Sequence, residues 1–163
     1  MAISSDEIPI SHLQRRKIEG RVIIPFIEEA RKRFGDQAAR EMVVAVIRRL
    51  AAEDGARWRD AYGRDFASLK KVAEEVWAGG GSLDLDVVAA SEDHLDFNVT
   101  RCGYAEFYRG LGLAELGYLI HCNRDHAMID GFNPDLALTR TQTVMEGASH
   151  CDFRFSKKRE VGP

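Results

Sequence analysis

The chain has 163 residues, of which 45% are hydrophobic and 30% are charged, so it is long enough for one core of ordinary size and too short for two comfortable domains. We expect a single domain over 1–163, with a helical part at 1–78 and a sheet-and-helix part at 82–156 that carries the site. The formal net charge of -3 leaves no basic footprint, which excludes nucleic acid as an expected partner and favours small molecules or proteins.

Cysteine usage and hydropathy indicate the compartment. Cys102, Cys122 and Cys151 are an odd number of cysteines at long spacings, with no CxxC pair and no secretory segment at the start of the chain. This pattern predicts reduced thiols in the cytoplasm. No apolar run approaches the roughly 18 to 20 residues that span a bilayer, so we expect no membrane segment.

Three amphipathic helices are expected in the first half of the chain. The first has an apolar stripe, with Pro25 at a kink or at a new first turn. Its stripe consists of Ile18, Val22, Phe26, Ala30 and Phe34. The second follows an N-cap at Asp36. Its stripe consists of Ala39, Met42, Val43, Val46, Ile47 and Leu50. Both stripes fit a core or a dimer face, so we also consider a homo-oligomer.

A third helix and a first hairpin follow. The helix contains Phe66, Leu69, Val72, Ala73 and Val76 and ends near a glycine run at 79–81, which indicates a flexible connector. After it, two alternating runs flank turn residues at 91–93 and predict a hairpin with one buried face. The runs are Leu83, Leu85, Val87 and Ala89, then Leu95, Phe97 and Val99. If the alternation continues, Arg101 shares the buried face.

A pair of helices is expected between this hairpin and the next. The first is short and covers Tyr104 to Leu111, and the second runs from about Ala114 to Ile129. Cys122, Asp125 and Met128 recur at intervals of three, which places them on one side of the second helix. His121 lies a turn before Asp125.

The last hairpin carries polar residues on a face that should be apolar. Its first strand has Leu136, Leu138, Arg140, Gln142 and Val144 on one face, a turn follows at 146–147, and its second strand has Cys151, Phe153 and Phe155 on one face. Because the leucines and phenylalanines face the core, Arg140 and Cys151 turn inward with them unless a bulge shifts the register.

These elements predict an α+β domain. N-terminal helices accompany a four-stranded antiparallel sheet made of two hairpins, with the helix pair between the hairpins and helices over one face of the sheet. Five polar side chains then converge between the sheet and the helix at 114–129: Arg101, Cys122, Asp125, Arg140 and Cys151.

This convergence indicates a small anionic substrate. A buried arginine needs a carboxylate partner, which is either Asp125 or a substrate anion, and its guanidinium grips a carboxylate with two parallel hydrogen bonds. A thiol near such cations is expected to have a lowered pKa and to be a better nucleophile.

Three segments resemble the L-2-amino-thiazoline-4-carboxylic acid hydrolase family. They are CNRDHAMIDGFNP, then LTRTQTVMEGASHCDFRF, and before both RCGYAEFYRGLGLAELGYLIHC, so the resemblance is specific from about Arg101 to Phe155. It implies a hydrolase acting on carbon–nitrogen bonds of a small cyclic amidine or cyclic amide that bears a carboxylate. The implied product is an N-carbamoyl amino acid. His126 departs from the pattern, since an aromatic residue is expected after the aspartate.

Two mechanisms are open for such a ring opening. In one, Cys151 or Cys122 attacks covalently while His121 or Asp125 relays the proton. In the other, Asp125 is the general base for a water molecule. In both, Arg140, with Arg101 or Arg154, holds the substrate carboxylate, and Thr141 or Thr143 is a candidate hydrogen-bond donor. No cofactor is expected.

The same residues also allow other interpretations. Asp125 has about equal standing as a structural partner of Arg140, and Asp152 with Arg154 alternates onto the solvated face of the hairpin. A zinc set of Cys102, Cys122 and Cys151 with His121 or His150 ranks well below a thiol or acid–base pocket, because it lacks any short ligand pair. His12 receives no role. The alternative function is a non-enzymatic sensor of a small organic acid, which would use the same arginines.

Overall fold

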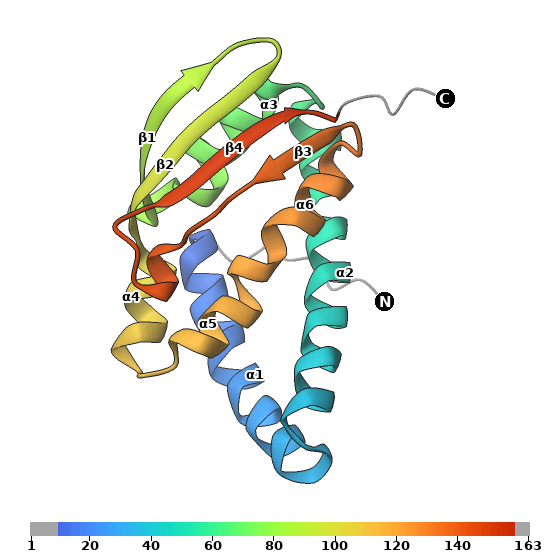
Figure 1. Cartoon of the computed structure of the whole chain (residues 1–163), viewed down its shortest axis with the longest axis vertical. Helices are drawn as coiled ribbons and strands as arrows, with labels where there is room; N and C mark the ends of the chain where they lie inside the picture. Colours follow the sequence, from blue (N-terminus) through green and yellow to red (C-terminus); the bar gives the residue numbers. More distant parts are fainter. Residues whose placement is uncertain (1–9, 159–163) are drawn as a thin grey trace.

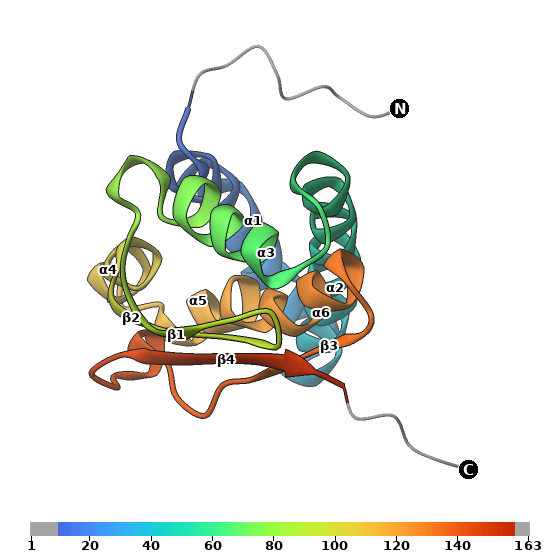
Figure 2. The ribbon, with the colours of Figure 1, turned by 90° about the horizontal axis from the view of Figure 1, so that it is seen from above.

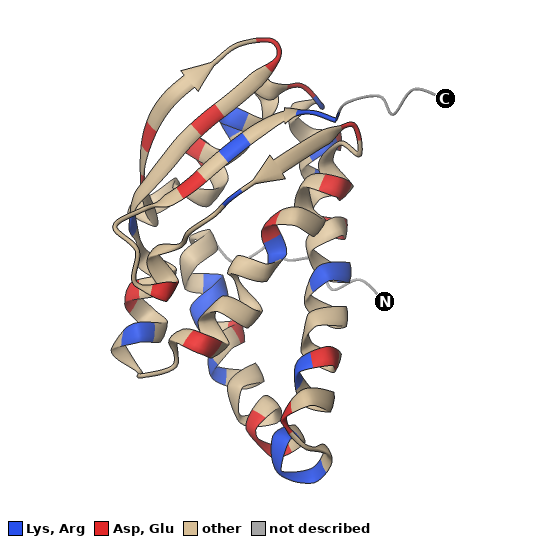
Figure 3. Cartoon of the chain, viewed as in Figure 1, with Lys and Arg blue, Asp and Glu red and all other residues tan. Residues whose placement is uncertain are grey.

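A computed structural model describes residues 10–158, so residues 1–9 and 159–163 of the expected single domain lie outside the described part. The fold is α+β, as the sequence predicts, with long N-terminal helices beside a four-stranded antiparallel sheet (Figure 1). Acidic and basic residues are interspersed along these elements (Figure 3). None of the helices in residues 10–158 is both long and apolar enough to cross a membrane.

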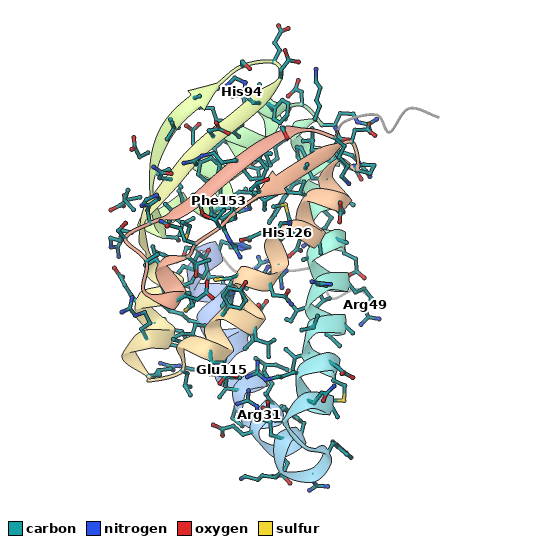
Figure 4. All side chains as sticks on the ribbon, in the orientation of Figure 1. Arg31, Arg49, His94, Glu115, His126 and Phe153 are labelled. Carbon is teal, nitrogen blue, oxygen red and sulfur yellow. The ribbon has the colours of Figure 1, made fainter. Side chains whose placement is uncertain are left out.

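The two longest helices, α1 (His12–Phe34) and α2 (Asp36–Tyr62), run side by side and extend away from the sheet (Figure 1). α1 continues through Pro25 instead of beginning again there. Gly35 joins the helices with a φ of 86°, a value that favours glycine, and it is the N-cap of α2, so Asp36 is the first helical residue and not the expected cap. Arg31 of α1 also donates to Glu115, at 3.1 Å (Figure 4).

The apolar stripe of α1, which fits a core or a dimer face, does not face the core. Its four large side chains are 57–69% exposed: Ile18, Val22, Phe26 and Phe34. The buried face consists instead of Arg16, Gly20, Ile24 and Ile27. At Gly20 a Cβ atom would collide with the Tyr108 hydroxyl, so the lack of a side chain lets α1 pack closely on the rest of the protein through this face.

The stripe of α2 is half right. Ala39, Val43 and Ile47 are buried, but Met42, Val46 and Leu50 are 40–52% exposed.

The homo-oligomer expected from these stripes stays a prediction, in which a second copy of the chain covers the exposed residues of α1. Light scattering is expected to give the molar mass of at least two chains, and Phe26→Ser is expected to shift it towards one chain. A single-chain mass for the unaltered protein would remove the oligomer.

A short helical segment leads from α2 into the sheet. α3 (Phe66–Lys71) continues as a π-helical stretch at Val72–Trp77, and Gly79–Gly81 form a 3-10 turn. Gly80 and Gly81 have φ values of 67° and 73°, so the glycine run is the connector that the sequence predicts.

The sheet consists of β1 (Leu83–Ala90), β2 (His94–Cys102), β3 (Leu136–Thr139) and β4 (Cys151–Lys157), in the order β1-β2-β4-β3. The helices lie over one face of it (Figure 2). That face carries the residues expected from the alternation: Leu95, Phe97 and Val99 of β2 and Cys151, Phe153 and Phe155 of β4, all buried. The inward orientation of Cys151 is thereby confirmed.

The inward orientation of Arg101 is wrong, because β2 contains a β-bulge. Leu85 pairs with Val99 but Asp84 pairs with Arg101, so Thr100 is the extra residue of β2. The bulge reverses the alternation after Val99. Arg101 therefore lies on the exposed side, where it donates to Glu106 and to the Gly81 carbonyl, and Cys102 points inward in its place.

The last hairpin has a shorter first strand than expected. β3 ends at Thr139, and the residues after it form a loop before a 3-10 turn at Val144–Glu146 and a left-handed Gly147. Asp152 of β4 accepts hydrogen bonds from the N–H groups of Thr141 and Gln142, both at 2.9 Å, and from the Thr141 hydroxyl at 2.6 Å. These bonds hold the loop that begins with Arg140.

The long helix expected at 114–129 is also wrong in detail. After α4 (Gly103–Gly110), this stretch divides into α5 (Ala114–Ile120), a 3-10 turn at Cys122–Arg124, and α6 (Asp125–Phe132). The N–H of Arg124 bonds to the carbonyl of His121, three residues back, which tightens the chain at the break. Cys122, Arg124 and Asp125 lie at this break and at the start of α6, and they face the same space as Val99 and Phe153 on the helix-covered side of the sheet.

Glycines let α2 and α6 approach until their backbones touch. A Cβ atom at Gly55 of α2 would collide with the Met128 carbonyl oxygen, and one at Gly131 of α6 would collide with that of Ala52. No side chain separates the two helices at these points. Backbone contact therefore sets the distance between α2 and the start of α6.

Candidate functional site

A cavity of about 110 Å³ lies at the junction of two hydrophobic clusters, one between the sheet and α6 and the other among α1, α2, α4 and α5. Its volume is below the roughly 300–1,000 Å³ of pockets for drug-sized ligands, so its guest is small. Apolar side chains form most of the wall, and the polar groups gather in two places. One group lies around Asp125 and the other around Asp54.

Arg140 and Asp125 form an ion pair in the wall of this cavity. The Arg140 side chain is only 5% exposed, that of Asp125 is 23% exposed, and the guanidinium also donates to the Cys122 carbonyl at 3.2 Å. The Tyr118 and Phe153 rings lie 5.9 and 5.7 Å from the guanidinium carbon, which is within cation–π range. Arg140 is thus turned inward as predicted, though from a loop and not from a strand.

The environment of Asp125 suits it to accept a proton. Burial raises the pKa of its carboxyl group to about 6, while Arg140 and Arg124 act in the opposite direction. Near neutral pH the group is therefore mostly ionised yet more basic than an ordinary aspartate. A base with a pKa close to the working pH is effective in general acid–base catalysis.

The thiols do not have the lowered pKa that was expected for them. Burial raises the pKa of Cys151 to about 11 and that of Cys122 well above its ordinary value, and Arg140 offsets only part of this. Desolvation of a thiolate in this apolar wall outweighs the attraction of one guanidinium that Asp125 already neutralises. Cys151 also accepts the Val144 N–H at 3.3 Å. Both thiols line the cavity, but in the neutral form.

Several of the expected carboxylate ligands lie outside the cavity. Arg101 is displaced by the bulge, and Arg154 lies on the outer face of the sheet, where it donates to the carbonyls of Phe97 and Phe153. The Thr141 hydroxyl is bound to Asp152. The Thr143 hydroxyl is bound to Glu146 at 2.7 Å, where it helps to cap the 3-10 turn. Of the expected arginines, only Arg140 reaches the cavity.

The two histidines near Asp125 differ in position. His121 lines the cavity and its Nε2 lies 3.1 Å from the Tyr108 hydroxyl, while burial and nearby Arg16 hold its pKa well below the usual range. It is therefore neutral. His126 projects from α6 (Figure 4), is exposed, and does not line the cavity.

The second polar group of the cavity was missed by the sequence analysis. Asp54 of α2 accepts hydrogen bonds from Arg16 at 2.8 Å and from Arg124 at 2.6 Å, and it also pairs with Arg57. The side chains of Arg16, Asp54 and Arg124 are only 9–11% exposed. Asp54 continues the buried series of α2 by a step of three from Ala51, and a carboxylate at such a position was the available signal.

Aromatic residues complete the wall beside Asp54. The ring of His12 lies 5.9 Å from that of Trp58 and 6.3 Å from that of Tyr104, and Trp58 lies 5.9 Å from Trp77. Burial and nearby Arg16 lower the pKa of His12 to about 3, so it is neutral. His12, to which no role was given, is therefore part of the cavity wall.

The alternative zinc set does not form. Cys102, Cys122, Cys151 and His121 all line the cavity, and the three thiols are free. Within residues 10–158, however, no group of three or more His, Cys, Asp or Glu side chains is placed to hold a metal ion. His150 is not in the cavity wall, and its Nδ1 lies 2.9 Å from the Ser149 hydroxyl.

Comparison with known protein families gives a match for this chain. The family model described as L-2-amino-thiazoline-4-carboxylic acid hydrolase matches residues 15–155. This match includes both polar groups of the cavity. No curated protein matches the chain.

Proposed function

With a match over residues 15–155, the chain belongs to the L-2-amino-thiazoline-4-carboxylic acid hydrolase family, and from this we propose that it opens a small cyclic amidine or cyclic amide that bears a carboxylate. The reference substrate is 2-amino-thiazoline-4-carboxylate, and the proposed product is an N-carbamoyl amino acid. The observation that carries the proposal is a partly buried, arginine-paired carboxylate, Asp125, in a small and mostly apolar cavity.

In the proposed reaction Asp125 is the general base. It removes a proton from water, and the water oxygen forms a bond to the sp2 ring carbon of the amidine. In a thiazoline the C=N π bond opens as this bond forms. The second proton of the water passes to that nitrogen when the tetrahedral intermediate collapses to a carbonyl and releases sulfur. In a cyclic amide the C=O π bond opens, and the intermediate releases the ring nitrogen. The protonated Asp125 returns the proton to that leaving atom, so substrate and one water give the ring-opened product.

Arg140 has a positioning role in this scheme. Its guanidinium fixes the orientation of the Asp125 carboxylate, and it donates to the Cys122 carbonyl at the same time. The Asp152 bonds to the following loop hold Arg140 in place. Among the two routes open from the sequence, direct attack by water is favoured, because a thiol with a pKa of about 11 is almost fully protonated near neutral pH.

The test is turnover by the purified, metal-stripped protein. Its substrates are a panel of small cyclic amidines and lactams that bear a carboxylate, analysed by mass spectrometry. A gain of one water is the expected result. Saturable binding without turnover would instead favour the sensor of a small organic acid and would contradict the hydrolase proposal.

We also propose a cytoplasmic location, which is expected from the three free thiols.

The rate of ring opening is expected to depend on pH through Asp125. Since the base acts in its ionised form, kcat/KM should rise with pH through about 6 and reach a plateau above about 7. A route through the Cys151 thiolate would instead keep rising towards a pKa of about 11. Rates measured from pH 4 to pH 10 with 2-amino-thiazoline-4-carboxylate decide between the two routes. A kcat/KM that still rises above pH 9 would contradict the Asp125 route.

A further inference from the structure

The polar group around Asp54 carries more positive charge than its own carboxylates neutralise. Three guanidinium groups, those of Arg16, Arg57 and Arg124, contact this one carboxylate, and Glu19 adds a second carboxylate at 2.7 Å from Arg16. Arg57 and Glu19 are 63% and 48% exposed, so solvent screens their charges. Among the buried side chains, Arg16 and Arg124 against Asp54 leave a surplus of one positive charge. The Arg140–Asp125 pair on the other side of the cavity is, by contrast, neutral.

The basic groups of this cluster differ in their pKa. Glu19 and Asp54 outweigh burial for Arg16 and raise its pKa, but not that of Arg124. Burial, followed by repulsion from Arg16, lowers the pKa of Arg124, and the same two causes act on His12 and His121. The attraction of Asp54 does not outweigh these effects for Arg124. An anion bound beside Arg124 would neutralise the surplus where solvent does not.

Hydrogen-bonding capacity is also left over here. Arg124 uses one terminal nitrogen for Asp54, and no bond within residues 10–158 is made by its other nitrogens. The Tyr104 hydroxyl, in the same wall, is buried and makes no hydrogen bond of normal geometry within those residues. Burial raises its pKa, and the neighbouring Ser82 side chain acts in the opposite direction. A buried polar group without a partner is costly, so this hydroxyl fits a ligand that completes its bonding.

We propose that Arg124 and Arg16 bind the substrate carboxylate, which places the reacting ring carbon at Asp125. This assignment rests on the proposed function for the identity of the substrate. Arg124 and Asp125 are consecutive residues at the break before α6, and their side chains pair with different partners, Asp54 and Arg140. A small ring lying across the cavity thus meets a cationic group on one side and the general base on the other.

The assignment differs from the one suggested by the sequence, in which Arg140 holds the carboxylate. Arg140 already has an anionic partner of its own, whereas Arg124 shares the Asp54 carboxylate with Arg16 and Arg57. A bound carboxylate would leave the Arg140–Asp125 pair intact. It would also keep the negative charge of the substrate away from the base that must remain ionised for the reaction.

The experiment compares two ligands that differ only in the carboxylate. They are 2-amino-thiazoline-4-carboxylate and 2-amino-thiazoline, and their binding is measured by calorimetry, which needs no turnover. Arg124→Gln is expected to weaken binding of the acid about 10- to 100-fold, the usual loss for hydrogen bonds to a charged group, and to change binding of the neutral-ended analogue less than about 3-fold. Arg124→Lys should recover part of the affinity for the acid, because it restores the charge without the fork.

Arg57→Gln is the matched control. Arg57 contacts the same carboxylate and carries the same charge, but its side chain is 63% exposed and it does not line the cavity. Its substitution should change the affinity for either ligand less than about 3-fold. Circular dichroism of each variant separates loss of binding from loss of fold.

Two results would overturn the assignment. One is equal weakening of both ligands by Arg124→Gln in a folded protein, and the other is selective loss of the acid in Arg140→Gln with Arg124→Gln unaffected. If no ring is opened but acid binding still depends on Arg124, the hydrolase proposal fails and the carboxylate site stands. If rings are opened but binding of the acid does not depend on Arg124, the hydrolase proposal stands and the carboxylate site fails.

Discussion

Replacing Asp125 with asparagine is expected to lower kcat for ring opening by about 10²- to 10⁴-fold, the range that a general acid–base residue contributes. Asparagine keeps the shape of the side chain and an oxygen for Arg140, but it accepts no proton from water. The rate is measured by mass spectrometry with 2-amino-thiazoline-4-carboxylate, at a pH above 7 where the unaltered carboxylate is ionised.

Cys151→Ser is the control for that result. The serine hydroxyl can still accept the Val144 N–H, and the variant is expected to keep kcat within about tenfold because the thiol makes no bond to the substrate. A loss in Cys151→Ser as large as in Asp125→Asn, together with a covalent adduct of the protein in the mass spectrum, would show that the thiol is the nucleophile.

Replacing Asp54 with asparagine is expected to lower the free energy of unfolding by about 3–5 kcal/mol, the cost of breaking a buried ion pair by removing one partner. The substitution leaves Arg16 and Arg124 buried, with side chains only 9% and 11% exposed, and without the carboxylate they share. Denaturant unfolding at pH 7 measures the loss. Asp60→Asn on the same helix is the matched control, because the Asp60 side chain is 70% exposed and its pair with Arg59 contributes at most about 1 kcal/mol.

The effect of Asp54→Asn should also depend on pH. Burial raises the pKa of Asp54, but Arg16, Arg124 and Arg57 lower it more, so its pKa lies below the usual value. A carboxylate with a lowered pKa stabilises the folded state above its unfolded pKa of about 4, and this contribution is lost as the pH falls through the folded value. The two proteins should therefore converge in stability at acid pH. A constant difference from pH 7 to pH 2 would show that the carboxylate charge is not what stabilises this cluster.

The sequence predicts the sheet and one half of the site. Alternation of apolar residues in β2 and β4 locates the inner face of the sheet, and Cys151 follows it inward. The pairing of Arg140 with Asp125 follows from the cost of burying an arginine alone, and it holds although β3 ends one residue before Arg140. These features depend on short stretches of chain, where local pattern and structure agree.

The other half of the site depends on contacts between residues far apart in the sequence. Arg16 and Asp54 are 38 residues apart, and Arg124 is 70 residues from Asp54. Helical periodicity gives the spacing of a face but not which face is buried, so the apolar stripe at Ile18 and Val22 concealed a buried face that contains an arginine. A single extra residue in β2 places the Arg101 side chain on the opposite face of the sheet from the expected one, and the alternation of apolar residues does not reveal such a bulge.

The glycine contact between α2 and α6 has a consequence for redesign of this protein. Gly55 directly follows Asp54, and Gly131 belongs to the same helix, α6, as Asp125. The backbone contacts at these glycines therefore set the distance between the side of the cavity that binds the carboxylate and the side that carries the general base. The Trp58 and Trp77 side chains line the cavity between these two sides but do not determine that span. To accept a ring of another shape, a library should vary positions 58 and 77 and leave positions 55 and 131 as glycine.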